Sequence, residues 1–366
     1  MSILFQQAHI GSMVLKNRFV RSATWEGLAA EDGSVTEKLI NKMVELAKGG
    51  VGLIITGHAF VSEEGKAGPW QLGVHHDGLV DGLKKMATAV HNEGAKIVLQ
   101  LAHAGAFAVG NPEKPDLIPI APSAFKNSKE MSQEDIIRVV NCFAEAAKRA
   151  QDAGFDGVQI HAAHGYLLSQ FLSPYFNKRS DNYGGSVEKR AKIVVDILRA
   201  IREKVGNTFP VLIKMNSEDF LEGGLSVEDM LETARILEHE GLDAIELSGG
   251  TIISNKLIPV RLHKHGENEP YYLEASKRLK ATVKIPVILV GGIRSYETSE
   301  RIVLDGIADF IAMSRPFIRE PFLINRWQSG DTRPALCVSD NLCFGPAMKG
   351  EGIYCVREKK EHEKKA

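Results

Sequence analysis

The sequence predicts an α/β fold, a (β/α)8 TIM barrel with an N-terminal β-hairpin and a short C-terminal extension that contains cysteines. Eight short apolar runs, rich in β-branched residues, alternate along the chain with longer segments of helical periodicity. Several of these runs are apolar on both faces, as expected for a parallel sheet that helices cover. Eight such units in one chain fit a closed barrel best, and a doubly wound sheet is the runner-up because periodicity alone does not show closure.

The composition is that of a globular protein. The chain has 366 residues, of which 44% are hydrophobic and 25% charged, and its formal net charge is −1. These values exclude a disordered, collagen-like or coiled-coil chain, and the near-zero charge argues against a dedicated nucleic-acid-binding protein. We find no apolar run of membrane-spanning length and no secretory signal, so we expect a cytoplasmic protein with no membrane partner.

The elements are expected in the following order. A hairpin over residues 4–15, turning at Gly11 and Ser12, should plug the bottom of the barrel. The expected strands are residues 17–22, 51–56, 96–101, 157–161, 210–215, 243–247, 286–290 and 309–313. The expected helices are residues 36–48, 80–92, 188–204, 227–239, 273–282 and 296–305. A further helix should begin at Ser132, because an acidic residue three positions later completes a capping motif.

Two connections, residues 102–131 and 249–272, are much longer than the usual loop of about 2–6 residues. In a barrel both lie on the C-terminal face, where active sites form. We expect one barrel domain over residues 1–335 and an extension over residues 336–366, whose charged tail from Arg357 should be solvated or frayed.

Two expected strands carry polar residues near their ends, Gln100 and Lys214. Lys214 shares a strand face with Leu212, so an inward-facing Leu212 would direct Lys214 into the barrel mouth. A buried ammonium group needs an acceptor or an anion. Pairing with a neighbouring carboxylate such as Glu246 is the alternative explanation.

The segment HAAHGY follows the fourth strand and contains His161, His164 and Tyr166. Two imidazoles and a phenol supply hydrogen-bond donors and a proton source. No nearby third ligand completes a metal site, so donors for a carbonyl group or an anion are the better interpretation. Satisfied core histidines remain the alternative.

Glycines and an arginine follow the last two strands. Gly291 and Gly292 end the seventh strand, and Arg315 follows the eighth. Barrels commonly bind phosphate at this place through backbone N–H groups, and an arginine adds a fork-shaped donor.

Together these motifs resemble the old yellow enzyme family of FMN-dependent NAD(P)H oxidoreductases. The resemblance covers residues 3–330 and rests, in order, on LKNRFVRSAT, GLIITG, QLAHAG, QIHAAHGYLLSQFLSPYFNKRSDNYGGSVEKR, IKMNSEDF, ELSGG, VGGIR and FIAMSRPFI. The branch it resembles contains the barrel domains of 2,4-dienoyl-CoA reductase and trimethylamine dehydrogenase.

The resemblance implies FMN as cofactor and NADH or NADPH as reductant. Residues implied to line the flavin are Ser22, Ala23, Thr24 and Gln100, with Lys214 as the cation that stabilises the reduced ring. Residues implied to hold the phosphate are Gly291, Gly292, Ser314 and Arg315. His58 is a further candidate for the flavin edge, and an exposed loop histidine explains it equally well.

The resemblance also implies a reaction. His161 and His164 match the pair that binds a substrate carbonyl oxygen, and Tyr166 matches the proton donor. We therefore expect reduction of the activated C=C bond of an α,β-unsaturated carbonyl or an enoyl or dienoyl compound. A flavin-dependent amine (N-demethylating) dehydrogenase is the alternative, and a non-flavin phosphate-binding lyase or isomerase is a remote one. The family implies a homo-oligomer, either dimer or tetramer.

Two features bear on the substrate. Trp25 stands where other members have Thr, Cys or His, and it could narrow the substrate pocket. The second long loop carries the basic residues Lys256, Arg261, His263, Lys264 and His265. An acidic or CoA-linked substrate and a solvated charged loop explain these residues equally well.

The extension carries the pattern Cys337-x2-Asp340-x2-Cys343-x11-Cys355. The resembled branch holds a 4Fe-4S cluster there with four cysteines, and Asp340 replaces one of them. We favour reduced, structural cysteines. The reason is that thiolates are the preferred iron–sulfur ligands, and one of the four is missing. The alternatives are a cluster completed by Asp340 or an external ligand, and a zinc site.

Overall fold

The computed structural model describes residues 2–109, 117–262 and 269–363, and it confirms the predicted barrel. Its strands are β3 (Phe19–Arg21), β4 (Leu53–Ile55), β6 (Lys96–Ala102), β9 (Gly157–Ala162), β10 (Val211–Asn216), β11 (Ala244–Ser248), β12 (Val287–Val290) and β13 (Phe310–Met313). All neighbouring strands are parallel, and the ring closes because β3 pairs with both β4 and β13 while β4 also pairs with β6. This closure excludes the doubly wound sheet.

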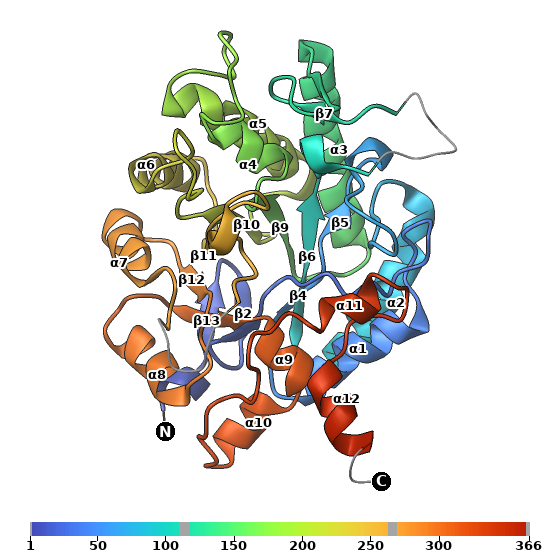
Figure 1. The fold of residues 1–366 in the computed structure, drawn as a ribbon, viewed down its shortest axis with the longest axis vertical. Helices are drawn as coiled ribbons and strands as arrows, with labels where there is room; N and C mark the ends of the chain where they lie inside the picture. The colour runs from blue at the N-terminus through green and yellow to red at the C-terminus, as the bar shows by residue number, and fades with distance from the viewer. Residues whose placement is uncertain (1, 110–116, 263–268, 364–366) are drawn as a thin grey trace.

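Helices surround the ring (Figure 1). Those that correspond to the expected helices are α1 (Glu37–Lys48), α2 (Val80–Asn92), α3 (Gln133–Asp152), α5 (Val187–Val205), α6 (Val227–His239), α7 (Leu273–Thr282) and α8 (Tyr296–Leu304). The predicted capping motif starts α3, since Ser132 and Asp135 exchange side-chain-to-backbone hydrogen bonds. No helix among the described residues is long and apolar enough to cross a membrane.

The predicted hairpin consists of β1 (Ala8–Ile10) and β2 (Met13–Leu15), which pair antiparallel. Ile10 and Leu15 are fully buried and pack with interior barrel residues, including Phe310. The turn residue Gly11 has a φ of +53°, and a Cβ there would lie 2.8 Å from Asp243. The hairpin therefore plugs the interior, as the sequence predicted.

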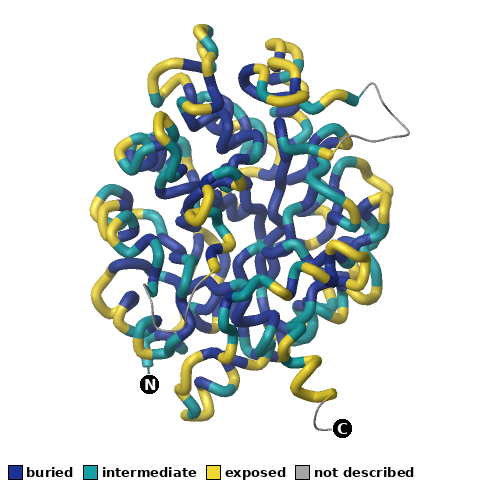
Figure 2. The backbone as a smooth tube through the Cα atoms, viewed as in Figure 1, coloured by how far each residue is buried: buried dark blue, intermediate teal, exposed yellow. Residues whose placement is uncertain are grey.

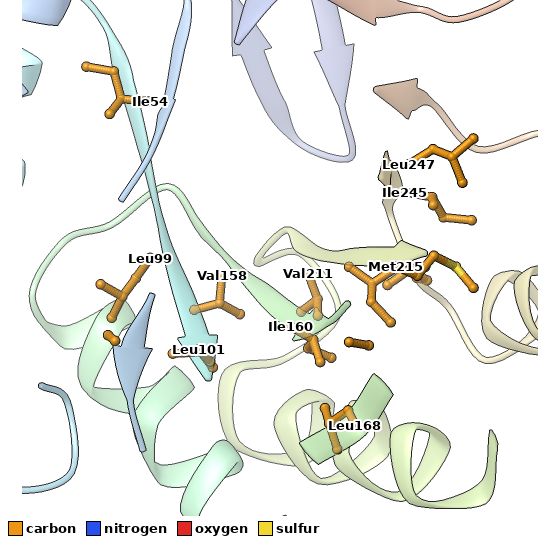
Figure 3. Packing of buried hydrophobic residues seen from close by; sticks show 14 of the residues in the cluster. Ile54, Leu99, Leu101, Val158, Ile160, Leu168, Val211, Met215, Ile245 and Leu247 are labelled. Atoms are coloured by element: carbon orange, nitrogen blue, oxygen red, sulfur yellow. The ribbon is translucent and has the colours of Figure 1, made fainter. Parts of the chain in front are cut away.

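Side chains alternate along each barrel strand. Figure 3 shows part of the outward set, in which Leu99, Ile160 and Val211 pack with helix residues such as Leu168. Leu212 belongs instead to the interior cluster that the hairpin completes. Lys214 has the same parity as Leu212 and therefore points into the barrel. This confirms the predicted inward direction of Lys214.

Several short elements were not predicted. They are β5 (Ala59–Phe60), β7 (Ile120–Ala121), β8 (Lys129–Glu130), α4 (Leu167–Leu172), α9 (Arg315–Arg319), α10 (Leu323–Gln328), α11 (Phe344–Ala347) and α12 (Val356–Glu363). Single 3-10 turns lie at Ile3–Phe5, Glu63–Gly65, Asp77–Leu79, Gly105–Phe107 and Asn255–Leu257.

The C-terminal tail differs from the expectation in one respect. Its described part, up to Glu363, is solvated, since no residue of α12 is buried and Figure 2 shows the helix mostly exposed, but this part is helical. Arg319 of α9 forms an ion pair with Glu361, with an Nη2–Oε2 distance of 2.5 Å. This contact ties the tail to the segment that follows the last barrel strand.

We predict that replacing Ile10 by alanine lowers the free energy of unfolding by about 2–5 kcal/mol, because the change leaves a cavity in a fully buried plug. Denaturant-induced unfolding measures the loss. Val14 lies on the same hairpin with 39% of its surface exposed, so Val14→Ala should change the value by less than ~0.5 kcal/mol. Equal losses in the two variants would contradict the plug.

Candidate active site

A cavity opens at the C-terminal ends of the barrel strands, where the active sites of barrel enzymes form. Eight of the residues predicted from the sequence line it: Ser22, Ala23, His164, Lys214, Gly291, Gly292, Ser314 and Arg315. Thr24, Trp25, His58, Gln100, His161 and Tyr166 are not among its lining residues.

A buried ion pair lies beneath the cavity. Lys214 and Glu246 are directly opposite each other on β10 and β11, and the Lys214 Nζ lies 3.1 Å from Glu246 Oε1. Ser22 joins them, since its hydroxyl accepts from Nζ at 2.7 Å and donates to Oε1 at 2.6 Å. Both explanations given for Lys214 therefore hold. Its side chain lies in the barrel mouth, and it pairs with Glu246.

Two glutamines extend this network across the barrel. Gln159 Nε2 donates to Glu246 Oε2 at 2.8 Å, and Gln159 Oε1 accepts from Gln100 Nε2 at 2.7 Å. Gln100 and Gln159 stand opposite each other on β6 and β9. Gln159 was not singled out from the sequence, although a polar residue in the apolar run GVQI was an available signal. The network fixes the orientation of the Gln100 amide beside the mouth.

The turn after β3 is held by another buried ion pair. Arg21 Nη2 lies 2.6 Å from Glu26 Oε1, and Arg21 also donates to the carbonyl oxygen of Ile55. Thr24 shares a hydrogen bond of 2.7 Å with the hydroxyl of Ser314, which follows β13. The first and last strands of the barrel thus present Ser22 and Ser314 to one cavity.

The three residues of HAAHGY and His58 form one cluster of rings. The ring centroid of His161 lies 5.2 Å from that of His164, 5.1 Å from that of Tyr166 and 6.4 Å from that of His58. The Tyr166 hydroxyl is 3.4 Å from His58 Nε2. The structure therefore brings together four candidates that come from β9, the turn after it, and the loop after β4.

Backbone geometry sets the orientation of these rings. His164 has a φ of +66° and Gly165 a φ of +84°. The chain therefore turns sharply between His164 and Tyr166, the two catalytic candidates on either side of Gly165. The buried Gln170 donates to the Gly165 carbonyl at 2.7 Å and fixes this turn. His161 Nδ1 accepts from the Ala163 N–H at 3.4 Å, which places the proton of a neutral imidazole on Nε2.

The cluster is uncharged at neutral pH. Burial lowers the pKa of His58 to about 4, and burial also lowers the pKa of His161 and His164 well below the usual value. The Lys214 ammonium lowers the pKa of both His161 and His164 further. Burial raises the pKa of Tyr166 to about 12. The imidazoles are thus neutral donors and the phenol keeps its proton.

The other end of the cavity contains the predicted phosphate residues. Gly291 and Gly292 have φ values of +116° and +80°, and a Cβ on either would lie within 2.8 Å of Tyr272 or Tyr271. Only glycine fits here, for backbone and steric reasons. Arg315 Nη1 lies within hydrogen-bonding distance of three oxygens, those of Arg261 O (2.8 Å), Ser339 O (3.3 Å) and Asn341 Oδ1 (2.7 Å).

Two arginines that were not predicted for this end lie near it; Arg294 lines the cavity, and Arg261 packs on the tyrosines that line it. Arg294 lines the cavity and pairs with Glu269 at 2.8 Å, while its Nη2 is buried with no hydrogen-bond partner among the described residues. Arg261 lies over the rings of Phe220, Tyr271 and Tyr272, and its Nε and Nη2 are buried in the same state. Arg294 follows Gly-Gly in VGGIR, which was an available signal.

These residues fit FMN. Buried arginine donors without partners are costly unless an anion accepts from them, and a phosphate group supplies such oxygens. Gly291 and Gly292 line the same cavity, and their positive φ values are those of glycine-rich turns, whose backbone N–H groups can bind phosphate. At the opposite end, Lys214 presents an N–H donor to the cavity, as the edge of a flavin ring requires, and Gln100 lies behind it in the network with Gln159 and Glu246.

Trp25 contacts the extension. It packs on the small cluster of Ile318, Cys343, Ala347 and Ile353, and the Ile353 N–H donates to the carbonyl oxygen of Glu26 at 2.8 Å. The basic loop is divided: Lys256 is exposed and Arg261 is buried, while His263, Lys264 and His265 lie outside the described residues.

The extension does not fit an iron–sulfur cluster. Cys337, Cys343 and Cys355 line one cavity with Asp340, but Asp340 is paired with Arg357 at 2.5 Å and Arg319 approaches the Cys355 sulfur at 3.6 Å. The described residues contain no group of three or more His, Cys, Asp or Glu side chains arranged to hold a metal ion. A zinc site in the extension lacks support for the same reason.

We predict that acidification destabilises the protein through the buried histidines. His58 has a folded pKa of about 4 against an ordinary value of 6.5, so the unfolded chain binds more protons between these pH values. The stabilisation is complete above pH 6.5 and is lost as the pH falls toward 4. Urea unfolding at pH 7 and pH 5 should show a smaller pH-dependent loss for His58→Gln than for the wild type, and an equal loss would contradict the assignment.

We predict that the protein purified anaerobically contains neither iron nor acid-labile sulfide, because its donor set is incomplete and paired with arginines. Metal analysis and sulfide determination check this. Asp340→Cys supplies the missing thiolate and should allow cluster uptake on anaerobic reconstitution, while Asp340→Asn should not. Stoichiometric iron and sulfide in the wild type would contradict the interpretation.

Comparisons with known proteins agree with this geometry. The family model described as NADH:flavin oxidoreductase / NADH oxidase family matches residues 3–333. An NADH oxidase of Thermoanaerobacter brockii is 37% identical over 96% of this chain and 57% of its own length. The structure of a 2-naphthoyl-CoA reductase in complex with 2-naphthoyl-CoA superposes with a TM-score of 0.88 at 28% identity, over 96% of this chain and 56% of the other.

A histamine dehydrogenase of Rhizobium sp. 4-9 superposes with a TM-score of 0.86 at 28% identity, over 96% of this chain and 52% of the other. The chain thus spans about half the length of these proteins. The match of the family model over nearly the whole barrel, together with the cavity and its donors, shows that this chain belongs to the NADH:flavin oxidoreductase / NADH oxidase family.

Proposed function

We propose that this chain is an FMN-dependent NAD(P)H oxidoreductase that reduces an activated C=C bond conjugated to a carbonyl or thioester group. The observation that supports this most is the ring cluster, in which His161, His164 and Tyr166 meet at the edge of a cavity lined by Lys214. The domain division that we propose is a barrel over residues 1–335 and an extension over residues 336–366.

FMN, when bound, supplies the hydride that NAD(P)H provides and the alkene accepts. The chain's own part begins with binding. Arg294, Arg315 and the glycine turn would hold the phosphate, while Lys214 and Gln100 would hold the ring edge. Ser22, Ala23 and Ser314, at the ends of the first and last strands, line the space between.

The histidines polarise the substrate carbonyl. His161 presents an Nε2–H, because its Nδ1 accepts from the backbone. His164 Nε2 lies 2.8 Å from the Ser248 hydroxyl; when Ser248 donates, the imidazole proton lies on Nδ1, the other ring nitrogen. Two neutral donors aimed at one oxygen stabilise the negative charge that develops there as hydride reaches the β-carbon.

Tyr166 completes the reduction by giving a proton to the α-carbon. Burial keeps the phenol protonated across the physiological pH range. His58 Nε2 lies 3.4 Å from its hydroxyl and is neutral, so it can accept a hydrogen bond from the phenol and orient it.

An amine dehydrogenase is the second candidate, because histamine dehydrogenase superposes well. It would need a base, or a neutral acceptor for the amine proton, where we place a proton donor. Two anaerobic mixing experiments test both functions: the reduced, FMN-loaded protein is mixed with enones and enoyl thioesters, and the oxidised, FMN-loaded protein is mixed with amines. Re-oxidation by alkenes supports the first, whereas reduction of the oxidised protein by amines supports the second.

We predict that Tyr166→Phe slows alkene reduction by about 10²–10⁴-fold, the usual contribution of a general acid. Flavin reduction by NAD(P)H needs no proton from Tyr166 and should change little. Stopped-flow measurement of the two half-reactions separates these effects. Equal slowing of both half-reactions would count against Tyr166 as the proton donor.

We predict that His161→Ala weakens binding of phenolic or enone ligands by about tenfold or more, since one hydrogen bond to a developing charge is worth about 1.5–3 kcal/mol. Spectral titration of the FMN-loaded protein measures the dissociation constant. His91→Ala is a matched control, because His91 pairs with Asp156 and neither residue lines the cavity. Unchanged ligand binding by His161→Ala would refute the proposed contact.

A further inference from the structure

We propose that Glu246 sets the reducing power of the bound flavin by balancing the charge of Lys214, an inference that rests on the proposed FMN binding. Glu246 is fully buried in β11, directly opposite Lys214 in the register of the sheet. A lysine at the ring edge by itself would favour the reduced, negatively charged cofactor. The structure instead places a carboxylate 3.1 Å from that lysine.

The contacts of Glu246 identify it as an ionised carboxylate. Its Oε1 accepts from the Ser22 hydroxyl and the Lys214 ammonium, and its Oε2 accepts from the Gln159 amide. An ionised carboxylate is an acceptor only, and all three contacts come from donors. Gln159 is fixed in this orientation because its oxygen accepts from Gln100.

Lys214 keeps one donor for a ligand. Of its three N–H groups, one points to Ser22 and one to Glu246, and the side chain also lines the cavity. The lysine can therefore contact the ring edge while its charge is offset by a carboxylate on the far side. The pair and its two hydrogen-bonding neighbours, Ser22 and Gln159, are buried, so charge interactions there are only weakly screened.

The balance has a direct chemical consequence. Transfer of a hydride from NAD(P)H adds two electrons and one proton to the cofactor and oxidises the nicotinamide, so one negative charge develops beside Lys214. A lysine without a counter-ion would stabilise that charge and weaken the tendency to pass the hydride on. Glu246 opposes the stabilisation, and it therefore makes the reduced cofactor a stronger hydride donor toward the alkene.

The test is the midpoint potential of the FMN-loaded protein, measured by equilibration with reference dyes. In Glu246→Gln the redox equilibrium should move about tenfold toward the reduced cofactor, which is about 30 mV upward for a two-electron couple. Glu246→Asp keeps the charge and should stay nearer the wild type, which a merely structural role would not predict. An unchanged or lower potential in Glu246→Gln overturns the proposal.

A double variant decides the question if Glu246→Gln does not fold, since that change leaves a buried ammonium without its counter-ion. Lys214→Met alone leaves the carboxylate unbalanced and should lower the potential, whereas Lys214→Met with Glu246→Gln keeps the net charge at zero and should lower it less. Equal potentials in these two variants would show that the charge of Glu246 has no effect on the cofactor and would overturn the proposal. If the wild-type chain takes up no FMN, the proposed function fails as well; if it binds FMN and reduces alkenes, only the role of Glu246 is at stake.

Discussion

The strict alternation of side chains along closed parallel strands is the constraint on which the rest of the molecule depends. Each strand must satisfy helices on one side and a small barrel interior on the other. Closure through β3, β4 and β13 fixes the parity of every residue. Polar residues at inward positions near the strand ends therefore form hydrogen bonds with one another inside the barrel, because the wall of strands separates them from solvent. Examples are Gln159, Lys214 and Glu246.

A second layer of the site is built by turns. The strands position the ion pair and the glutamines, whereas His164 and Tyr166 are oriented by a left-handed turn that Gln170 holds. The network of the ion pair and the glutamines is held in place because its polar groups have buried partners. The turn is held in place because the Gly165 carbonyl accepts a hydrogen bond from Gln170. Both layers direct donors to one cavity, which is what preorganised stabilisation of a developing charge requires.

The order of strands and helices, the hairpin plug and the Ser132 cap could be predicted because these signals are local and periodic. The inward direction of Lys214 followed from parity with Leu212. What the sequence could not supply were contacts between distant segments. Arg294 is one example, because its partners Glu269 and Ser339 lie 25 and 45 residues away from it in the chain. No periodicity of the sequence connects these positions. The helical state of Val356–Glu363 was missed because a charged stretch carries no apolar stripe.

Arg315 belongs to two places at once. It lines the cavity at the strand ends and also the cavity in the extension, and it contacts Ser339 and Asn341. A ligand that contacts Arg315 in the first cavity would therefore also stabilise the folded extension. By thermodynamic linkage, the folded extension would strengthen binding of that ligand by the same free energy. The cysteine-bearing extension is in this way a thermodynamic partner of the cavity at the strand ends.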